Sequence, residues 1–286
     1  MQYEAPETIE AAVTLLAGQA GLARVLAGGT DLLVQLRSGV IEPDLVVDIK
    51  RIPVMRKIAR EGGGFRIGAA VSGAELREHA ELRAAWPGVV EAANLIGSTQ
   101  VQGRATLIGN LCNASPAADS VPAMVAAGAT ASVVGPKGRR EVPVEQIAVS
   151  PGKTSLAKGE LVESVYLPPR PAHAGDAYLR FIPRSEMDIA VVGVGVSLVM
   201  DDKGVCRDAR VALGAVAARV LLVGEAGAAL IGSAVDDAAL ARMAAAASAA
   251  CQPIDDKRGT KEFRIEVAGV LAQRAARTAL ERARRK

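Results

Sequence analysis

The chain has 286 residues, of which 50% are hydrophobic, 23% charged and 2% aromatic, and its formal net charge at pH 7 is +3. This length gives room for roughly two domains, and the composition is ordinary for a soluble globular protein. The balanced charge excludes the basic surface expected of a nucleic-acid-binding protein, and the scarcity of aromatic residues excludes a base-stacking platform.

The beginning of the chain predicts a helix, a strand, a helix and a strand in that order. Thr8 is a suitable N-cap for the first helix, and a short apolar strand follows at residues 22–27. A helix at 31–39 and a strand at 44–49 complete a parallel, right-handed strand–helix–strand unit. The tight loop 28–31 lies where the first strand meets the helix, so its backbone amides are expected to point outward and hold an anionic group.

The middle of the chain alternates further strands and helices. Ser72 and Glu75 have the spacing of a capping box and predict a helix that starts soon after a strand at 65–70. The other elements predicted here are helices at 88–96 and 120–129 and a hairpin at 130–145.

Small polar residues gather in the stretch RATLIGNLCNASPAAD at 104–119, which contains no His and no pair of carboxylates. Apolar segments flank it on both sides, so we expect a loop that is drawn into the protein. A semi-buried loop must satisfy its own amides and carbonyls. Its Asn and Ser side chains can do this as turn formers, or they can donate to the phosphates and ring carbonyls of a ligand, and the spacing alone favours neither.

The last part of the chain is set off by the proline-rich run at 167–175, which predicts a boundary. A long hairpin is expected at 188–216, with its turn at 201–204. The Ala-rich remainder is expected to be helical to the end, where the basic residues 281–286 suit the C-terminus of a helix.

Several other candidate sites favour structural interpretations. Residues 193–198, GVGVSL, lack the third glycine of a dinucleotide fingerprint, so these glycines are expected to allow close packing. His79 and His173 have no nucleophile motif beside them and are expected to be surface or capping residues. Trp86, next to a proline, is expected to be a packing residue.

The three cysteines, Cys112, Cys206 and Cys251, are isolated from one another and from histidine. Neither a zinc site nor an iron–sulfur cluster is therefore expected. An odd number of scattered thiols is typical of a reducing compartment. The N-terminus lacks the pattern of a signal peptide and no apolar run has membrane-spanning length, so we expect a cytoplasmic protein.

Three sequence blocks occur together in this chain: AGGTDLL at 27–33, TQVQGRATLIGNLCNASPAADSVPA at 99–123, and the stretch from Arg180 to MDIAVVG at 187–193. On these blocks the sequence resembles the FAD-binding medium subunit of molybdenum hydroxylases. This is the family of carbon monoxide dehydrogenase, the bacterial N-heterocycle hydroxylases and the flavin region of xanthine dehydrogenase. The similarity covers essentially the whole chain, with the blocks in the family's order and spacing.

The resemblance implies an α+β fold in two domains. A two-lobed FAD-binding domain of the vanillyl-alcohol-oxidase (PCMH) type would occupy residues 1–170, with lobes of about 1–53 and 54–170. A smaller α+β C-terminal domain, with an antiparallel sheet and helices, would occupy residues 175–286.

The resemblance also implies how FAD would be held. Residues 27–31 would bind the pyrophosphate on backbone amides, and residues 106–110 would form the second half of the cradle. Asp119 matches the carboxylate that usually binds a cofactor hydroxyl, and Ile96 and Val162 match apolar contacts to the adenine side. Arg180 and Asp188 would lie near the flavin ring, and no catalytic residue or metal ligand is implied on this chain. The full set of implied cofactor-binding residues is Val25, Leu26, Ala27, Gly28, Gly29, Thr30, Asp31, Leu32, Ile96, Thr106, Ile108, Gly109, Asn110, Asn113, Ser115, Asp119, Val162, Arg180 and Asp188.

The sequence departs from the family pattern at two of these positions. The family usually has Gly-Gly-Asn where this chain has Ile108, Gly109 and Asn110, and a branched side chain there would crowd the flavin or change which acceptor reaches it. Arg180 stands where a Lys is common, which keeps the charge but changes the geometry.

The resemblance implies an electron-transfer subunit in which FAD carries the redox chemistry. Electrons would arrive from [2Fe–2S] clusters on a small partner subunit and leave for an external acceptor, while a large molybdopterin subunit hydroxylates the substrate. The assembly would be a dimer of such heterotrimers. Three other functions stay open: a stand-alone flavin-dependent oxidoreductase with its own substrate pocket, a nicotinamide-binding dehydrogenase, and a scaffold without cofactor.

Overall fold

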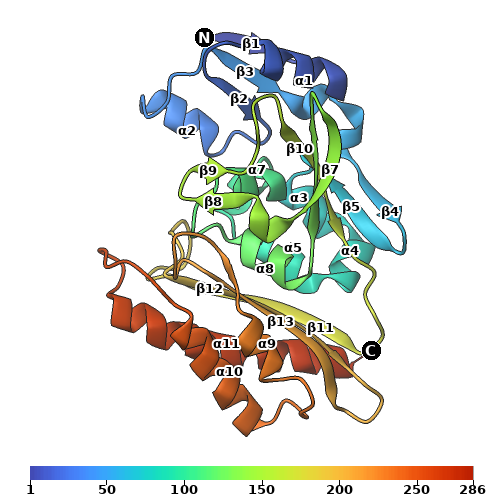
Figure 1. Ribbon diagram of the computed structural model, residues 1–286, viewed down its shortest axis with the longest axis vertical. Helices are drawn as coiled ribbons and strands as arrows, with labels where there is room; N and C mark the ends of the chain where they lie inside the picture. The colour runs from blue at the N-terminus through green and yellow to red at the C-terminus, as the bar shows by residue number, and fades with distance from the viewer. Residues whose placement is uncertain (286) are drawn as a thin grey trace.

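The computed structural model describes residues 1–285, so Lys286 of the predicted basic tail lies outside the described residues. The N-terminal part of the chain forms the upper half of the molecule and the C-terminal part the lower half (Figure 1). Two hydrophobic cores follow this division, one built almost entirely from residues 9–167 and one from residues 177–283. The expected α+β fold, with a separate antiparallel sheet near the C-terminus, is confirmed.

The first sheet confirms the predicted order of helix, strand, helix and strand. Strands β2 (Ala23–Leu26) and β3 (Leu45–Asp48) are parallel neighbours, with Val25 opposite Val47. Helix α1 (Ile9–Gly18) begins at Thr8, whose side chain accepts a hydrogen bond from the backbone N–H of Ala11. The short helix α2 (Leu32–Arg37) follows the glycine turn. Sequence reasoning missed strand β1 (Gln2–Glu4), which is exposed and pairs in parallel with β3.

The second sheet has the order β4-β5-β10-β6-β7 and is antiparallel throughout. The predicted capping box starts α3, since Ser72 accepts from the N–H of Glu75 and the carboxylate of Glu75 accepts from the N–H of Ser72. The strands are β4 (Ile58–Glu61), β5 (Gly64–Gly68), β10 (Leu161–Leu167), β6 (Thr130–Gly135) and β7 (Gly138–Pro143). The helices of this part are α3 (Gly73–Glu78), α4 (Ala80–Ala85), α5 (Pro87–Ala93), α6 (Thr99–Gln102), α7 (Leu107–Cys112) and α8 (Ser120–Ala126). Shorter elements are η1 (Ile49–Arg51), η2 (Pro53–Arg56), η3 (Val144–Gln146), β8 (Ala148–Ser150) and β9 (Lys153–Thr154).

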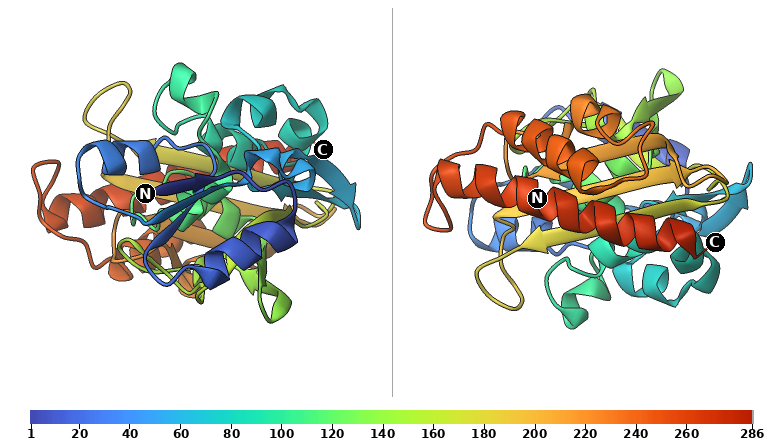
Figure 2. Two further views of the ribbon diagram at one scale, coloured as in Figure 1. Left: turned by 90° about the horizontal axis from the view of Figure 1, so that it is seen from above. Right: turned by 90° about the horizontal axis from the view of Figure 1, so that it is seen from below.

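The lower half is a four-stranded antiparallel sheet in the order β11-β12-β13-β14. The predicted hairpin is its centre, formed by β12 (Val192–Met200) and β13 (Cys206–Gly214), and β11 (Ala174–Phe181) pairs with β12. Helices α10 (Asp237–Ala249) and α11 (Lys261–Arg284) cover the outer face of the sheet (Figure 2). On the inner face α5 and α8 of the upper half pack against it, so the sheet is buried on both sides. No helix within residues 1–285 is both long and apolar enough to cross a membrane.

Two predictions about these elements are wrong. The stretch 104–119 is not a continuous loop, because residues 107–112 form helix α7 with Thr106 as its N-cap. The remainder after residue 216 is not helical throughout, since it contains strand β14 (Leu221–Leu222) and a non-helical segment at 251–260. Helix α9 (Gly224–Ala228) comes between β14 and α10. The histidine and tryptophan interpretations hold: His79 caps α4, and Trp86 is 4% exposed.

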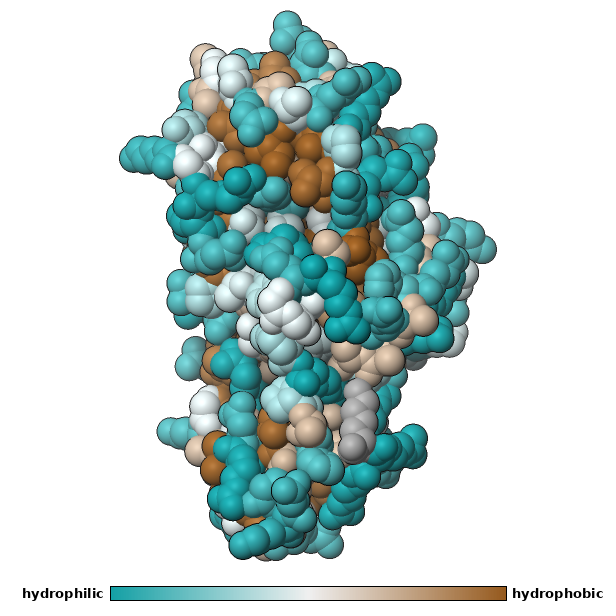
Figure 3. Space-filling model, turned by 90° about the vertical axis from the view of Figure 1, so that its right-hand side faces the viewer, coloured by the Kyte–Doolittle hydropathy of each residue, from teal (hydrophilic) through white to brown (hydrophobic). Residues whose placement is uncertain are grey.

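The junction between the halves combines close backbone packing with ion pairs. A Cβ atom on Gly195, in the middle of β12, would lie 2.4 Å from the carbonyl oxygen of Pro122 in α8. Arg282 of α11 pairs with Glu91 of α5, with nitrogen–oxygen distances of 2.6 and 3.0 Å. On the face shown in Figure 3, hydrophobic residues gather over the upper half while the middle is largely hydrophilic. The close approach of the Pro122 backbone to Gly195 shows that the glycines of 193–198 have the packing role that the sequence predicts.

We expect Gly195→Ala to lower the free energy of unfolding by about 1–3 kcal/mol, because the added methyl group meets backbone and not a flexible side chain. Urea unfolding of the purified chain measures the change. The matched control is Gly224→Ala, at the start of α9, where nothing lies within 4 Å of an added Cβ. Equal stability of the two variants would contradict the close packing of β12 on α8.

Candidate functional site

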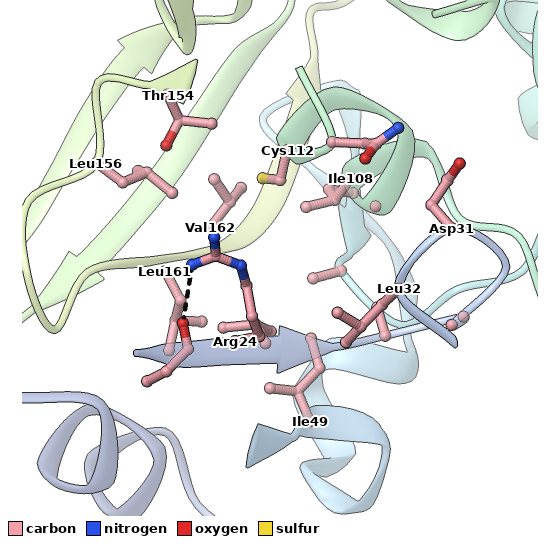
Figure 4. A pocket seen from close by; sticks show the side chains of 18 of the residues that line it. Arg24, Asp31, Leu32, Ile49, Ile108, Cys112, Thr154, Leu156, Leu161 and Val162 are labelled. Carbon is pink, nitrogen blue, oxygen red and sulfur yellow. Dashed lines mark hydrogen bonds between the residues drawn. The ribbon is translucent and has the colours of Figure 1, made fainter. Parts of the chain in front are cut away.

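A cavity of about 640 Å³ lies in the upper half between the first sheet, helix α7 and the start of β10 (Figure 4). One wall is β2 with the turn that follows it, and the facing wall is formed by α7 and the segment 152–162. The blocks at 27–33 and 99–123 both border this cavity, although about seventy residues separate them in the chain. The fold therefore brings together two of the three blocks that the sequence singled out.

The two blocks touch directly at Gly28. A Cβ atom at this position would lie 1.9 Å from the carbonyl oxygen of Arg104, so no residue other than glycine fits without moving the backbone. The next residue, Gly29, has a φ of +80°, a conformation that L-residues with side chains rarely adopt. Both glycines of the turn are thus required by the backbone geometry.

The turn that lines the cavity carries free backbone donors. Within the described chain, the N–H groups of residues 28–32 donate no hydrogen bond, and Asp31 does not cap α2 with its side chain. These residues line the cavity, so the free donors can hold an anionic group, as the sequence predicts.

Helix α7 forms the opposite side of the cradle. Thr106 accepts a hydrogen bond from the N–H of Gly109 at 2.9 Å, which fixes the start of the helix. The carbonyl oxygen of the Asn110 side chain accepts from the N–H and hydroxyl groups of Ser120 at 3.1 and 2.7 Å. The side-chain carbonyl of Asn113 accepts from Gln35 at 3.1 Å, which ties α7 to α2.

These contacts combine the two roles that the sequence left open for the polar residues. The carbonyl ends of Asn110 and Asn113 satisfy donors of the protein itself. Their NH₂ groups have no partner among residues 1–285, and both residues line the cavity. Each asparagine therefore fixes the fold with one end and keeps donors for a ligand at the other.

Lys50 is a supporting residue that sequence reasoning missed. Its ammonium group donates to the carbonyl of Ala27 at 3.1 Å and to the carboxylate of Asp48 at 2.7 Å. Tyr3 donates to the same carboxylate at 2.6 Å. Burial acts to raise the pKa of Asp48, but the hydrogen bonds from Lys50 and Tyr3 outweigh it and hold the pKa below its usual range. The only available sequence signal was a lysine two residues after the aspartate that ends β3.

Most of the predicted site residues lie at the cavity. Those that line it are Val25, Ala27, Gly28, Gly29, Thr30, Asp31, Leu32, Ile96, Thr106, Ile108, Gly109, Asn110, Asn113 and Val162. Ile108 is only 4% exposed and also belongs to the hydrophobic core. The cavity lining does not include Leu26, Ser115, Asp119, Arg180 or Asp188.

Asp119 and Arg180 form a buried ion pair across the junction of the two halves. Arg180, in β11, donates to the carboxylate at 2.8 Å, and Tyr178 of the same strand donates at 3.2 Å. Burial raises the pKa of Asp119 to about 6, because the loss of hydration outweighs the attraction and hydrogen bond of Arg180. Arg180 also borders a second cavity of about 230 Å³, lined by residues of α6 and of the segment 94–98.

Asp188 lies elsewhere, in the loop between β11 and β12, where it pairs with Arg258 at 2.9 Å. The hydrogen bond from Arg258 lowers the pKa of its carboxyl group.

The cavity offers no thiolate at Cys112. Cys112 borders it, but burial raises the pKa of this thiol to about 12, so it stays protonated. Within residues 1–285 no group of three His, Cys, Asp or Glu side chains is placed to hold a metal ion. The arrangement is suited to holding an anionic molecule at the turn.

Comparisons with known proteins agree with this geometry. The family model described as "FAD binding domain in molybdopterin dehydrogenase" matches residues 1–170, and the one described as "CO dehydrogenase flavoprotein C-terminal domain" matches residues 177–279. The chain is 33% identical over 282 residues to the carbon monoxide dehydrogenase medium chain of Afipia carboxidovorans, covering 99% of this chain and 97% of that protein.

Two further similarities show the same pattern. The chain is 34% identical over 217 residues to a putative xanthine dehydrogenase FAD-binding subunit of Escherichia coli, covering 75% of this chain and 74% of the relative. A crystal structure of carbon monoxide dehydrogenase from Hydrogenophaga pseudoflava matches with a TM-score of 0.94 and 33% identity, covering 99% of this chain and 98% of that chain.

The raised pKa of Asp119 predicts a pH-dependent contribution to stability. The folded state holds this proton more tightly than the unfolded chain, so the contribution is full below about pH 4 and is lost as the pH rises through about 6. We expect the stability of the wild type relative to Asp119→Asn to fall by about 2 kcal/mol between pH 4 and pH 7.

Urea unfolding midpoints of both proteins across this pH range provide the measurement. Asp208→Asn, at an exposed position of β13, is the control and should follow the wild type. A difference between wild type and Asp119→Asn that stays constant with pH would rule out this role of the carboxyl group.

Proposed function

Because this chain belongs to the family of FAD-binding subunits of molybdopterin dehydrogenases, we propose that it is the FAD-carrying electron-transfer subunit of a molybdenum-containing hydroxylase. The observation that carries the proposal is the contact between the two glycine-bearing segments at Gly28 and Arg104, beside a single cavity. A nicotinamide-binding dehydrogenase does not fit, because Gly193 and Gly195 lie inside strand β12 and pack against other parts of the protein.

The residues present fit FAD. The cavity volume of about 640 Å³ lies within the range of sites for small molecules and cofactors. The free N–H groups of residues 28–32 face the place where a pyrophosphate would lie, and the NH₂ groups of Asn110 and Asn113 supply donors from the other side. We assign the pyrophosphate to this cradle between the turn and α7.

FAD, when bound, supplies the electron-accepting and electron-donating chemistry that the side chains lack. The chain's own residues bind and orient it. Lys50 holds the carbonyl of Ala27, so that the turn keeps its amides towards the cavity, and the Gln35–Asn113 hydrogen bond holds α2 and α7 at a fixed separation. The protonated thiol of Cys112 leaves this part of the wall uncharged.

We propose further contacts to FAD from residues outside the lining of the cavity. Asp119 would bind a hydroxyl group of the cofactor, and Arg180, which pairs with it, would lie near the flavin ring with Asp188 close by. The domain limits proposed are 1–170, with lobes of about 1–53 and 54–170, and 175–286.

The electrons would come from iron–sulfur clusters on a small partner subunit and leave to an external acceptor. A large molybdopterin subunit would carry out the hydroxylation, and the cytoplasmic assembly would be a dimer of heterotrimers. Relatives of similar identity are named for carbon monoxide and for xanthine, which supports placing substrate selectivity on another polypeptide.

Purification of the tagged chain from its native host tests the proposal. We expect visible flavin absorbance, release of FAD on denaturation, and two co-purifying subunits that carry molybdopterin and iron–sulfur clusters. A flavoprotein that purifies alone and oxidises an organic substrate would support the stand-alone oxidoreductase instead. A colourless chain that does not take up added FAD would refute both.

The close contact at Gly28 predicts the effect of a single methyl group. Because Gly28→Ala must push the turn away from Arg104, we expect FAD affinity to fall by at least about 10-fold. Bound FAD per polypeptide after dialysis against known FAD concentrations is the readout. Gly18→Ala, at the end of α1 with open space around it, should keep the wild-type affinity. Full flavin content in Gly28→Ala would contradict the cradle.

A further inference from the structure

A second cavity, of about 230 Å³, lies where the two halves of the molecule meet. Its wall is formed by residues of α3, α6 and the segment 94–98 from the upper half, and by Arg180 and residues 185–186 from the lower half. The volume is several times the roughly 30 Å³ that one water molecule occupies, so a small ion fits. The described linings of the two cavities have no residue in common, so this is a separate site.

Two arginines in this wall have donors that the protein leaves free. Arg77 of α3 is half-buried, and its side chain has no hydrogen bond or ion pair within residues 1–285. The side chain of Arg180 is 6% exposed, and its one partner in the described chain is the carboxylate of Asp119, which binds a single terminal nitrogen. A guanidinium carries five N–H donors, so Arg180 keeps donors for a ligand.

Asn94 adds an acceptor that lacks a donor. Its NH₂ group donates to the carbonyl of Val90 at 2.7 Å, which fixes the orientation of the side-chain amide. Gln102 donates to the backbone carbonyl of Asn94 at 2.7 Å and holds the residue in place. The side-chain carbonyl oxygen of Asn94 is buried, and no group in the described part of the chain donates to it. Since an unpaired buried acceptor is destabilising, this oxygen favours a ligand that brings an O–H or N–H group.

These donors and this acceptor together define the chemistry of the ligand. Arginine side chains match the oxygens of carboxylate and phosphate groups. At neutral pH a carboxylate or a sulfate ion carries no proton and would leave the acceptor of Asn94 unpaired, whereas inorganic phosphate always keeps at least one O–H group. Glu186, the only carboxylate in the described part of the lining, is exposed, so two positive groups stand against one negative group.

We propose that the second cavity binds inorganic phosphate, with Arg77 and Arg180 donating to its oxygens and Asn94 accepting from its hydroxyl group. The bound ion joins α3 of the upper half to β11 of the lower half. A phosphate monoester fits less well, because its second pKa is about 6 and it is mostly unprotonated at neutral pH. The inference goes beyond the proposed function and does not depend on it.

The test measures binding of radiolabelled orthophosphate to the full-length, FAD-loaded chain by equilibrium dialysis near neutral pH. FAD fills the anion-binding turn of the first cavity, so the second site is the one counted. We expect one phosphate per chain, and binding about 10-fold weaker in Arg77→Ala. Arg219→Ala, which is exposed and outside both linings, is the control and should bind phosphate like the wild type.

Competition by unlabelled sulfate tests the role of Asn94. In the wild type we expect sulfate to compete about 10-fold more weakly than phosphate, because it cannot donate to the buried oxygen. Asn94→Leu removes the acceptor, so this preference should disappear. The comparison of Arg77→Ala with the wild type stays valid in a chain that takes up no FAD, so failure of the proposed function and failure of this site are distinguishable.

Four results would overturn the inference. Equal phosphate binding by the wild type and Arg77→Ala would show that Arg77 does not contact the ion. Equal competition by sulfate in the wild type would show an adventitious ion only. Phosphate that binds the flavin-free chain and is expelled by FAD would assign the second cavity to the cofactor, and tighter binding of adenosine monophosphate than of orthophosphate would show a site for a monoester.

Discussion

The close approach of the turn at Gly28 to the backbone at Arg104 is the contact on which the site depends. It joins the parallel first sheet to the helix-rich segment before α7, and it requires a residue without a side chain, since an added Cβ would lie 1.9 Å from a carbonyl oxygen. Lys50 and Gln35 hold the two sides of this contact through the carbonyl of Ala27 and the amide of Asn113. The hydrogen bond from Lys50 to Ala27 therefore fixes the chain at the entry to the turn whose amides stay free.

The lower half of the molecule packs against the upper half through strands β11 and β12. Gly195 lets β12 approach the backbone of α8, and Arg180 of β11 reaches across to Asp119 at the start of the same helix. A buried ion pair adds little net stability, because the desolvation of both charges offsets their attraction. Its effect is to fix a positive group at a defined position beside the junction, where it borders the second cavity.

The local signals of the sequence predicted most of this fold. Thr8, the Ser72–Glu75 capping box and the hairpin at 188–216 act over a few residues, so they can be read directly from the chain. Strand β1 has three exposed residues and exists because β3 offers an edge to pair with, which no local pattern contains. Helix α7 was missed because asparagine and glycine favour turns, and here the Thr106 cap and burial of Leu107 and Leu111 override that preference.

At the site, too, local sequence signals could be read from the chain, whereas contacts between distant residues could not. Family resemblance pointed to the two glycine segments, whereas Lys50 and Gln35 act through contacts between residues far apart in the chain and leave no pattern of their own.

FAD carries the redox chemistry in this family, so the part of the chain is to bind and orient the cofactor. The cavity shows features for binding, namely the free backbone donors of the turn and the NH₂ groups of Asn110 and Asn113, beside a thiol that burial keeps protonated. These donors act together only in the folded chain, because about seventy residues separate the turn from α7 in the sequence.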